Sequence, residues 1–103
     1  MADRVRYLCM YDIRDARRLR RVHDIAVDFG ERLQYSVYVC DLTRQQFVGF
    51  RATLRETMHL GEDSISIFDL GPADGRAAVR VEHLGRRAPA ADDAAAGPDA
   101  VIW

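Results

Sequence analysis

The stretch from Val5 to Asp12 constrains the fold more than any other part of this chain. It is rich in apolar and strand-forming residues, which predicts a β-strand that ends on a carboxylate. Its alternating side chains are apolar on both sides: Leu8 and Met10 on one, and Tyr7, Cys9 and Tyr11 on the other. An antiparallel sheet with one wet face would alternate apolar and polar residues. The pattern therefore predicts a sheet whose two faces are both covered.

The length of 103 residues is enough for one domain with its own core. Hydrophobic residues make up 49% and charged residues 30%, which is typical of a soluble globular domain. No run resembles a membrane span or a signal peptide, so we expect a cytoplasmic protein with no membrane partner. Cys9 and Cys40 fall in predicted strands without a CxxC spacing, which favours buried reduced thiols.

Periodicity predicts two helices and three further strand segments: helices over 16–29 and from 44 to about 58, a strand-rich segment over 32–42, and strands over 64–70 and 78–84. Asp15 is placed to cap the first helix. Thr43 and Gln46 have the spacing of a capping box that opens the second helix. The segment 32–42 fits either one bent strand or two short strands that turn near Gln34 and Tyr35.

This order of elements predicts an α+β, ferredoxin-like βαββαβ fold over residues 1–85. Its antiparallel sheet would carry two helices on one face, plus an extra C-terminal strand over 78–84. Because two helices cover only one face, a second copy of the chain is the simplest cover for the other, and we expect a homodimer packed sheet to sheet. The strand over 78–84 would then pair with the sheet edge of the partner.

Residues 86–103 differ in composition from the rest of the chain. They are rich in alanine, proline and aspartate, which predicts a low-complexity, disordered tail. The tail ends on Val101-Ile102-Trp103, which we interpret as a frayed terminus, with a docking peptide for a partner as the alternative.

Charge patterning points to a local basic surface. The net charge of -1 does not indicate a nucleic-acid binder as a whole, yet all 15 basic residues are arginine. Five of them directly follow the first strand: Arg14, Arg17, Arg18, Arg20 and Arg21. Arginine binds phosphate in a bidentate manner, so we favour contact with a nucleic-acid backbone over a merely solvated helix face. Arg18 differs, because helical spacing puts it on the inward side, within reach of the end of the first strand.

Several sequence motifs, taken in order and spacing, resemble the CRISPR-associated protein 2 family over about Val5 to Leu70. They are Tyr11-Asp12-Ile13, Arg20-Arg21-Val22, the run from Gly30 through Arg32, Gln34 and Ser36 to Tyr38, and Cys40-Asp41-Leu42. The resemblance implies a ferredoxin-fold homodimer that joins the CRISPR-associated protein 1 integrase in acquiring spacers for antiviral defence. Some members of the family are magnesium-dependent endonucleases that act on single-stranded RNA or double-stranded DNA, and others serve as scaffolds.

The resemblance also implies a set of site residues. Asp12 takes the position of the metal-binding acid, for Mg²⁺ or Mn²⁺, and Tyr11 is its neighbour in the motif. Arg21, Arg32 and Ser36 match the remaining positions of the candidate catalytic set. Ser36 has no evident His/Asp relay, so we do not expect it to act as a nucleophile.

Asp12 admits two interpretations. Mg²⁺ needs only one or two protein carboxylates, so a two-fold axis that brings two copies of Asp12 together would complete a metal site. The alternative is a structural acid that caps the turn or pairs with Arg14 or Arg18. From residues alone the structural role is the commoner one, and the resemblance favours the metal. His23 flanks the apolar stripe of the first helix, and we expect it at the surface or boundary.

These features are compatible with three alternative functions. The first is a subunit of CRISPR adaptation that binds duplex DNA non-specifically and cleaves RNA or DNA at paired Asp12 carboxylates. The second is a non-catalytic adaptor of the spacer integrase complex. The third is an unrelated ferredoxin-fold RNA-binding or regulatory module, which ranks last because the strands lack the signature of an RNA-recognition motif.

Overall fold

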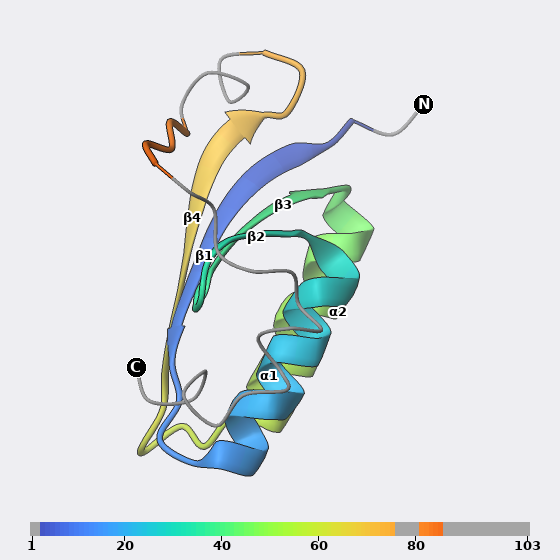
Figure 1. Ribbon diagram of the computed structural model, residues 1–103. Coiled ribbons are helices and arrows are strands. Elements are labelled where there is room, and N and C mark those ends of the chain that lie inside the picture. The colour runs from blue at the N-terminus through green and yellow to red at the C-terminus, as the bar shows by residue number, and fades with distance from the viewer. Residues whose placement is uncertain (1–2, 76–80, 86–103) are drawn as a thin grey trace.

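A computed structural model describes residues 3–75 and 81–85 of the chain. The elements follow the predicted order: β1 (Val5–Asp12), α1 (Ala16–Phe29), β2 (Glu31–Gln34), β3 (Val37–Leu42), α2 (Arg44–Thr57) and β4 (Ser64–Pro72). The four strands form an antiparallel sheet in the order β2-β3-β1-β4, and both helices lie on one face of it (Figure 1). This arrangement confirms the ferredoxin-like fold. Neither described helix has the length and apolar character needed to cross a membrane.

Local signals place the helix starts as expected. The Asp15 carboxylate accepts a hydrogen bond from the Arg18 backbone N–H at 3.0 Å, so it is the N-cap of α1. Thr43 and Gln46 form both halves of a capping box at the start of α2. Of the two possibilities for 32–42, the structure has two short strands, β2 and β3, joined by a tight turn at Tyr35 and Ser36.

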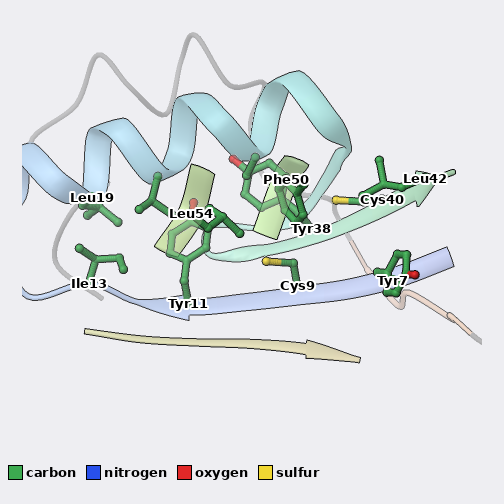
Figure 2. Packing of buried hydrophobic residues seen from close by; sticks show 12 residues of the cluster. Tyr7, Cys9, Tyr11, Ile13, Leu19, Tyr38, Cys40, Leu42, Phe50 and Leu54 are labelled. Atoms are coloured by element: carbon green, nitrogen blue, oxygen red, sulfur yellow. The ribbon is translucent and has the colours of Figure 1, made fainter. Parts of the chain in front are cut away.

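The core lies between the sheet and the helices. Figure 2 shows the side chains of one face of β1 and β3 directed toward the helices, where they meet apolar residues of α1 and α2. The buried cluster includes Tyr7, Cys9, Tyr11, Leu19, Val22, Ala26, Tyr38, Cys40, Phe50 and Leu54. Both cysteines are free thiols, as predicted, and burial raises their pKa to about 11 for Cys9 and about 12 for Cys40. At neutral pH they act as small apolar groups.

The opposite side of the sheet, which we term the open face, is also apolar. Leu8 and Met10 of β1 point to this side, opposite Val37 and Val39 of β3, and Phe68 of β4 lies across from Leu8. Met10 is 40% exposed and Phe68 is 49% exposed. Neither described helix packs against this face (Figure 1). The single chain therefore leaves the second apolar face of β1 without a helical cover.

The strand predicted over 78–84 is not formed within residues 81–84, which have irregular backbone. Residues 78–80 and the predicted tail over 86–103 lie outside the described residues. A strand needs a neighbouring edge for its backbone hydrogen bonds. The prediction assigned that edge to a second copy, and among the described strands the outer edges of β2 and β4 have no neighbour.

Gly30 is required where α1 passes into β2. A Cβ at this position would lie 2.5 Å from both the Cys40 Sγ atom and the Val39 carbonyl oxygen. Gly30→Ala should therefore lower the free energy of unfolding by about 1–3 kcal/mol, because backbone and a buried thiol must shift. Urea denaturation monitored by circular dichroism measures this.

Gly49→Ala is the matched control. Gly49 lies within α2, and a Cβ there would meet no atom within 4 Å. The helix gains propensity, so this variant should be more stable by about 1 kcal/mol. Equal effects of the two substitutions would contradict the close contact at Gly30.

Candidate active site and nucleic-acid interface

Asp12 ends β1 at the edge of the open face. It alternates with Tyr11, so its side chain is on the same side of the strand as Met10, and it is exposed. The register pairs it with Ser64 at the start of β4, while the Tyr11 N–H donates to the Ser36 carbonyl at 3.1 Å. Asp12 thus lies between the β2–β3 turn and the first residue of β4. Within residues 3–75 and 81–85 its carboxylate takes part in no hydrogen bond or ion pair.

Two other acids cap the turn after β1 and pair with Arg18, which were the structural roles considered for Asp12. Asp15 caps α1, and Arg18 pairs with Asp63, its Nε lying 2.7 Å from Oδ2. The prediction that Arg18 reaches inward is correct, but its partner is a residue of the α2–β4 loop. Asp12 is therefore exposed and available for a ligand, as the metal interpretation requires.

Asp63 is the key residue that sequence reasoning missed. Its side chain is fully buried, and its two oxygens accept from the Arg14 and His59 backbone N–H groups, each at 2.8 Å, and from the Arg18 guanidinium. The hydrogen bond from Arg18 holds the pKa of Asp63 well below its usual range. An acid directly before a predicted strand was the available signal, but its partners lie far away in sequence.

Tyr11, although adjacent to Asp12 in the chain, faces the core. Its ring stacks on Tyr38 with centroids 6.0 Å apart, and burial strongly raises the pKa of its hydroxyl. The hydroxyl lies 3.5 Å from the Tyr35 carbonyl oxygen. Because neighbouring strand residues point to opposite faces, Tyr11 and Asp12 are on opposite sides of the sheet. The structure therefore gives Tyr11 a packing role and does not bring its hydroxyl to the Asp12 carboxylate.

Arg32 is half-buried beside the β2–β3 turn. Its Nη2 donates to the Tyr35 carbonyl at 2.9 Å, and its guanidinium lies 4.9 Å from the Tyr35 ring centroid. The Nε and Nη1 atoms are buried and have no hydrogen-bond partner among the described residues. Ser36 is half-buried in the same turn. Ser36 is near the end of β1, where its carbonyl accepts from the Tyr11 N–H. Arg32 is in register with Tyr38 and, through it, with Cys9 of β1, and Tyr35 covers its guanidinium.

The prediction that His23 lies at the surface or boundary is wrong. His23 is 8% exposed, and its Nδ1 lies 2.8 Å from the Tyr38 hydroxyl. A polar ring can enter the core here because the tyrosine hydroxyl satisfies one of its nitrogens. Tyr38 comes from β3, so no pattern within α1 could have revealed this contact.

The arginine cluster at the start of α1 divides into two parts. Arg18 is held by Asp63 and by Glu62, whose Oε1 lies 3.0 Å from Nη2. The remaining members are exposed and form no ion pair with a described residue: Arg14, Arg17, Arg20 and Arg21. We term these four the α1 arginine patch. It begins where β1 ends, so it lies at the same end of the molecule as Asp12 (Figure 1).

The described residues of one chain offer few ligands for a metal ion. The described residues contain no group of three or more His, Cys, Asp or Glu side chains arranged for an ion. Asp12 supplies an exposed carboxylate at this end of the open face. Mg²⁺ and Mn²⁺ favour oxygen ligands, and Mg²⁺ retains waters and needs few carboxylates, so a pair of Asp12 residues from two copies fits such an ion.

Comparison with known proteins assigns the family. The family model described as CRISPR associated protein Cas2 matches residues 5–76. The chain belongs to the Cas2 family. A Geobacter sulfurreducens relative, named CRISPR-associated endoribonuclease Cas2, is 41% identical over 68 residues, which are 66% of this chain and 72% of that protein. A Thermus thermophilus relative of the same name is 35% identical over 73% of this chain and 80% of its own length.

The fold of this Cas2 chain also matches a solved structure. The crystal structure of Streptococcus pyogenes Cas2 at pH 6.5 is similar with a TM-score of 0.67 and 34% identity, over 78% of this chain and 99% of that one. The matched family region includes Asp12, Arg21, Arg32, Ser36 and Asp63. The candidate site and the acid that organises it thus lie within the part of the chain that defines the family.

Asp63→Asn tests the role of the buried acid. Because the folded-state pKa of Asp63 is lowered, its stabilising effect is complete above the ordinary aspartate range and is lost as the pH falls through the lowered value. Near neutral pH the variant should lose about 3 kcal/mol of unfolding free energy. The difference from wild type should narrow as the pH falls below about 4. Urea titrations at several pH values measure both effects.

Asp28→Asn provides the control, since Asp28 is an exposed acid of α1. It should change stability by no more than about 0.5 kcal/mol at any of these pH values. A pH-independent loss in Asp63→Asn would show that shape, and not charge, explains the effect.

Proposed function

We propose that this Cas2 chain is a CRISPR adaptation subunit. It would act as a homodimer that binds duplex DNA without sequence specificity and joins the CRISPR-associated protein 1 integrase in spacer acquisition. The observation that carries the proposal is the exposed Asp12 carboxylate at the end of the open face, beside the α1 arginine patch. Family membership supports it, and makes a module unrelated to CRISPR untenable.

The open face supports the homodimer. Monomeric proteins seldom expose large apolar patches, and here Met10 and Phe68 are both well exposed on one face of the sheet. A second copy would cover this face with an identical surface, as a two-fold interface requires. Since Asp12 lies at the edge of the same face, the two carboxylates would approach one axis.

The same arrangement supports phosphodiester cleavage. Two Asp12 carboxylates would hold Mg²⁺ or Mn²⁺, and the bound ion would activate water and offset negative charge on the phosphate under attack. Arg21, exposed on α1, would hold a flanking phosphate through its planar guanidinium. Arg32 would do so only after Tyr35 moves off its guanidinium. The relatives from Geobacter sulfurreducens and Thermus thermophilus are named endoribonucleases, which supports RNA as a substrate beside DNA.

A non-catalytic adaptor is the second candidate, and one observation favours it. Tyr11 points into the core and Tyr35 covers Arg32, so two of the candidate catalytic groups are not presented beside Asp12. In this case Asp12 would only shape the dimer interface. Both candidates use the same open face and the same arginine patch, and they differ in hydrolysis alone.

The dimer is tested by Phe68→Glu. A charge in the middle of the apolar interface would be desolvated without a partner, so the variant should be a monomer where the wild type is a dimer. Light scattering coupled to size exclusion measures the mass of each. Val48→Glu is the control, because Val48 is similarly exposed, at 51%, but lies on α2. A monomeric wild type, or a dimeric Phe68→Glu variant, would contradict sheet-to-sheet packing.

Asp12→Asn separates the nuclease from the adaptor. It should lower Mg²⁺-dependent cleavage of single-stranded RNA or duplex DNA by about 100-fold or more, because the carboxylate charge that binds the ion is lost. Duplex binding and the dimer mass should remain. The measurement is a gel assay of labelled substrates with and without EDTA.

The control is Asp24→Asn, an exposed acid of α1 away from the end of β1. It should cleave at the wild-type rate. Equal cleavage by wild type and Asp12→Asn would identify a contaminating nuclease and favour the adaptor.

A further inference from the structure

A groove between α2 and β4 has walls that are both apolar and basic. We term this hollow, of about 340 Å³, the α2–β4 groove. Seven side chains line it: Leu54, Met58, Leu60, Ile65, Ile67, Arg51 and Arg55. Leu60 is 63% exposed, so part of the apolar wall is open to solvent. A wall of neighbouring apolar side chains that stays open to solvent is typical of a binding groove.

The two arginines of the groove are available to a ligand. Both are exposed, and neither forms an ion pair with a described residue. The Arg51 guanidinium lies 5.6 Å from the Phe47 ring centroid, and this contact limits its freedom. An acidic group that enters the groove would therefore meet two positive charges beside an apolar wall, which focuses their field.

The strand beside the groove favours a peptide as the ligand. Ile65 and Ile67 belong to β4, which is an edge strand and has no neighbour on its outer side among the described strands. Edge strands leave backbone N–H and C=O groups unpaired, and proteins commonly cover such edges with another segment. An extended peptide with acidic and large apolar side chains would use the arginines, the apolar wall and the strand edge together.

The chain contains one such peptide outside the described residues. Residues 99–103 read Asp-Ala-Val-Ile-Trp, and the stretch 88–103 holds three acids and no basic residue. Asp99 lies fourteen positions after Gly85, the last described residue, and an extended chain of that length spans roughly 46 Å. The longest dimension of the molecule is 39 Å, so the segment is long enough to reach the groove.

We propose that residues 99–103 dock in the α2–β4 groove of their own chain. The Asp99 carboxylate would pair with one of the two groove arginines, and the apolar side chains at 101–103 would cover the apolar wall. A tethered segment has a high effective concentration, so even a weak contact of this kind is populated. The inference does not depend on the proposed function, because it involves neither nucleic acid nor the open face.

Trp103 reports directly on this contact, because it is the only tryptophan of the chain. The emission of the whole wild-type chain should be blue-shifted relative to N-acetyltryptophanamide, and acrylamide should quench it less, since docking shields the indole from water. Emission and quenching equal to those of N-acetyltryptophanamide would identify residues 101–103 as a frayed terminus and would overturn the inference.

Leu60→Ser tests the apolar wall at an exposed position. It should shift the emission to the red and increase quenching, while circular dichroism stays that of the wild type. Val48→Ser is the matched control, because Val48 is 51% exposed on α2 but does not line the groove, and it should keep the wild-type emission. If Leu60→Ser also keeps it, the indole is shielded elsewhere and the inference fails.

Arg51→Gln/Arg55→Gln tests the charge. It should shift the emission in the same direction, as should a high concentration of NaCl, because both weaken the attraction between Asp99 and the groove. Arg44→Gln is the control, since Arg44 is exposed at the opposite end of α2. An unchanged emission in the double variant would contradict the pairing with Asp99.

Mixing two variants separates docking within one chain from docking on a second copy. Leu60→Ser protein is mixed with an excess of Trp103→Phe protein, which has intact grooves and no tryptophan. The emission should stay red-shifted. A return of the blue shift would show that the segment binds the groove of another copy, and the same-chain arrangement would be wrong.

Discussion

The candidate site depends on the ion pair and the hydrogen bonds of the buried Asp63 carboxylate. A charged group with no exposed surface is tolerated only when hydrogen bonds and an opposite charge replace its water. Asp63 obtains these from Arg18 and from the backbone of Arg14 and His59. One side chain thus joins the start of α1 to the loop before β4. Because Arg18 pairs with Asp63, it does not pair with the Asp12 carboxylate.

Successive side chains of β1 point to opposite faces of the sheet, so residues that are adjacent in sequence have different roles. Tyr7, Cys9 and Tyr11 pack in the core against the helices, and so they stabilise the fold. Asp12 and Met10 point to the open face, so they remain for association and for a ligand. The family motif therefore mixes a packing residue with a candidate ligand. This division also explains why adaptor and nuclease are both compatible with one fold.

The distribution of acids decides which arginines remain available. Arg6 forms a bidentate pair with Asp41 across β1 and β3, and Arg18 is held by Asp63. Neither has its full charge free for a partner. The four arginines of the α1 arginine patch form no ion pair with an acid in the described part of the chain, so the positive charge is local even though the net charge of the chain is -1. A duplex would meet this surface through charge, and sequence preference has no evident source in it.

The sequence by itself determined the features whose partners are near in the chain. The caps at Asp15 and Thr43 involve residues three positions away, and the apolar alternation of β1 is visible within eight residues. Both helices, the fold class and the second apolar face could therefore be predicted, whereas the strand expected over 78–84 is not formed within residues 81–84. Only the tertiary structure decided the rest. Asp63 and Arg18 are 45 residues apart, and His23 meets Tyr38 from another element. Long-range contacts of this kind depend on how the elements pack, and no local pattern encodes which donor a buried acid will find.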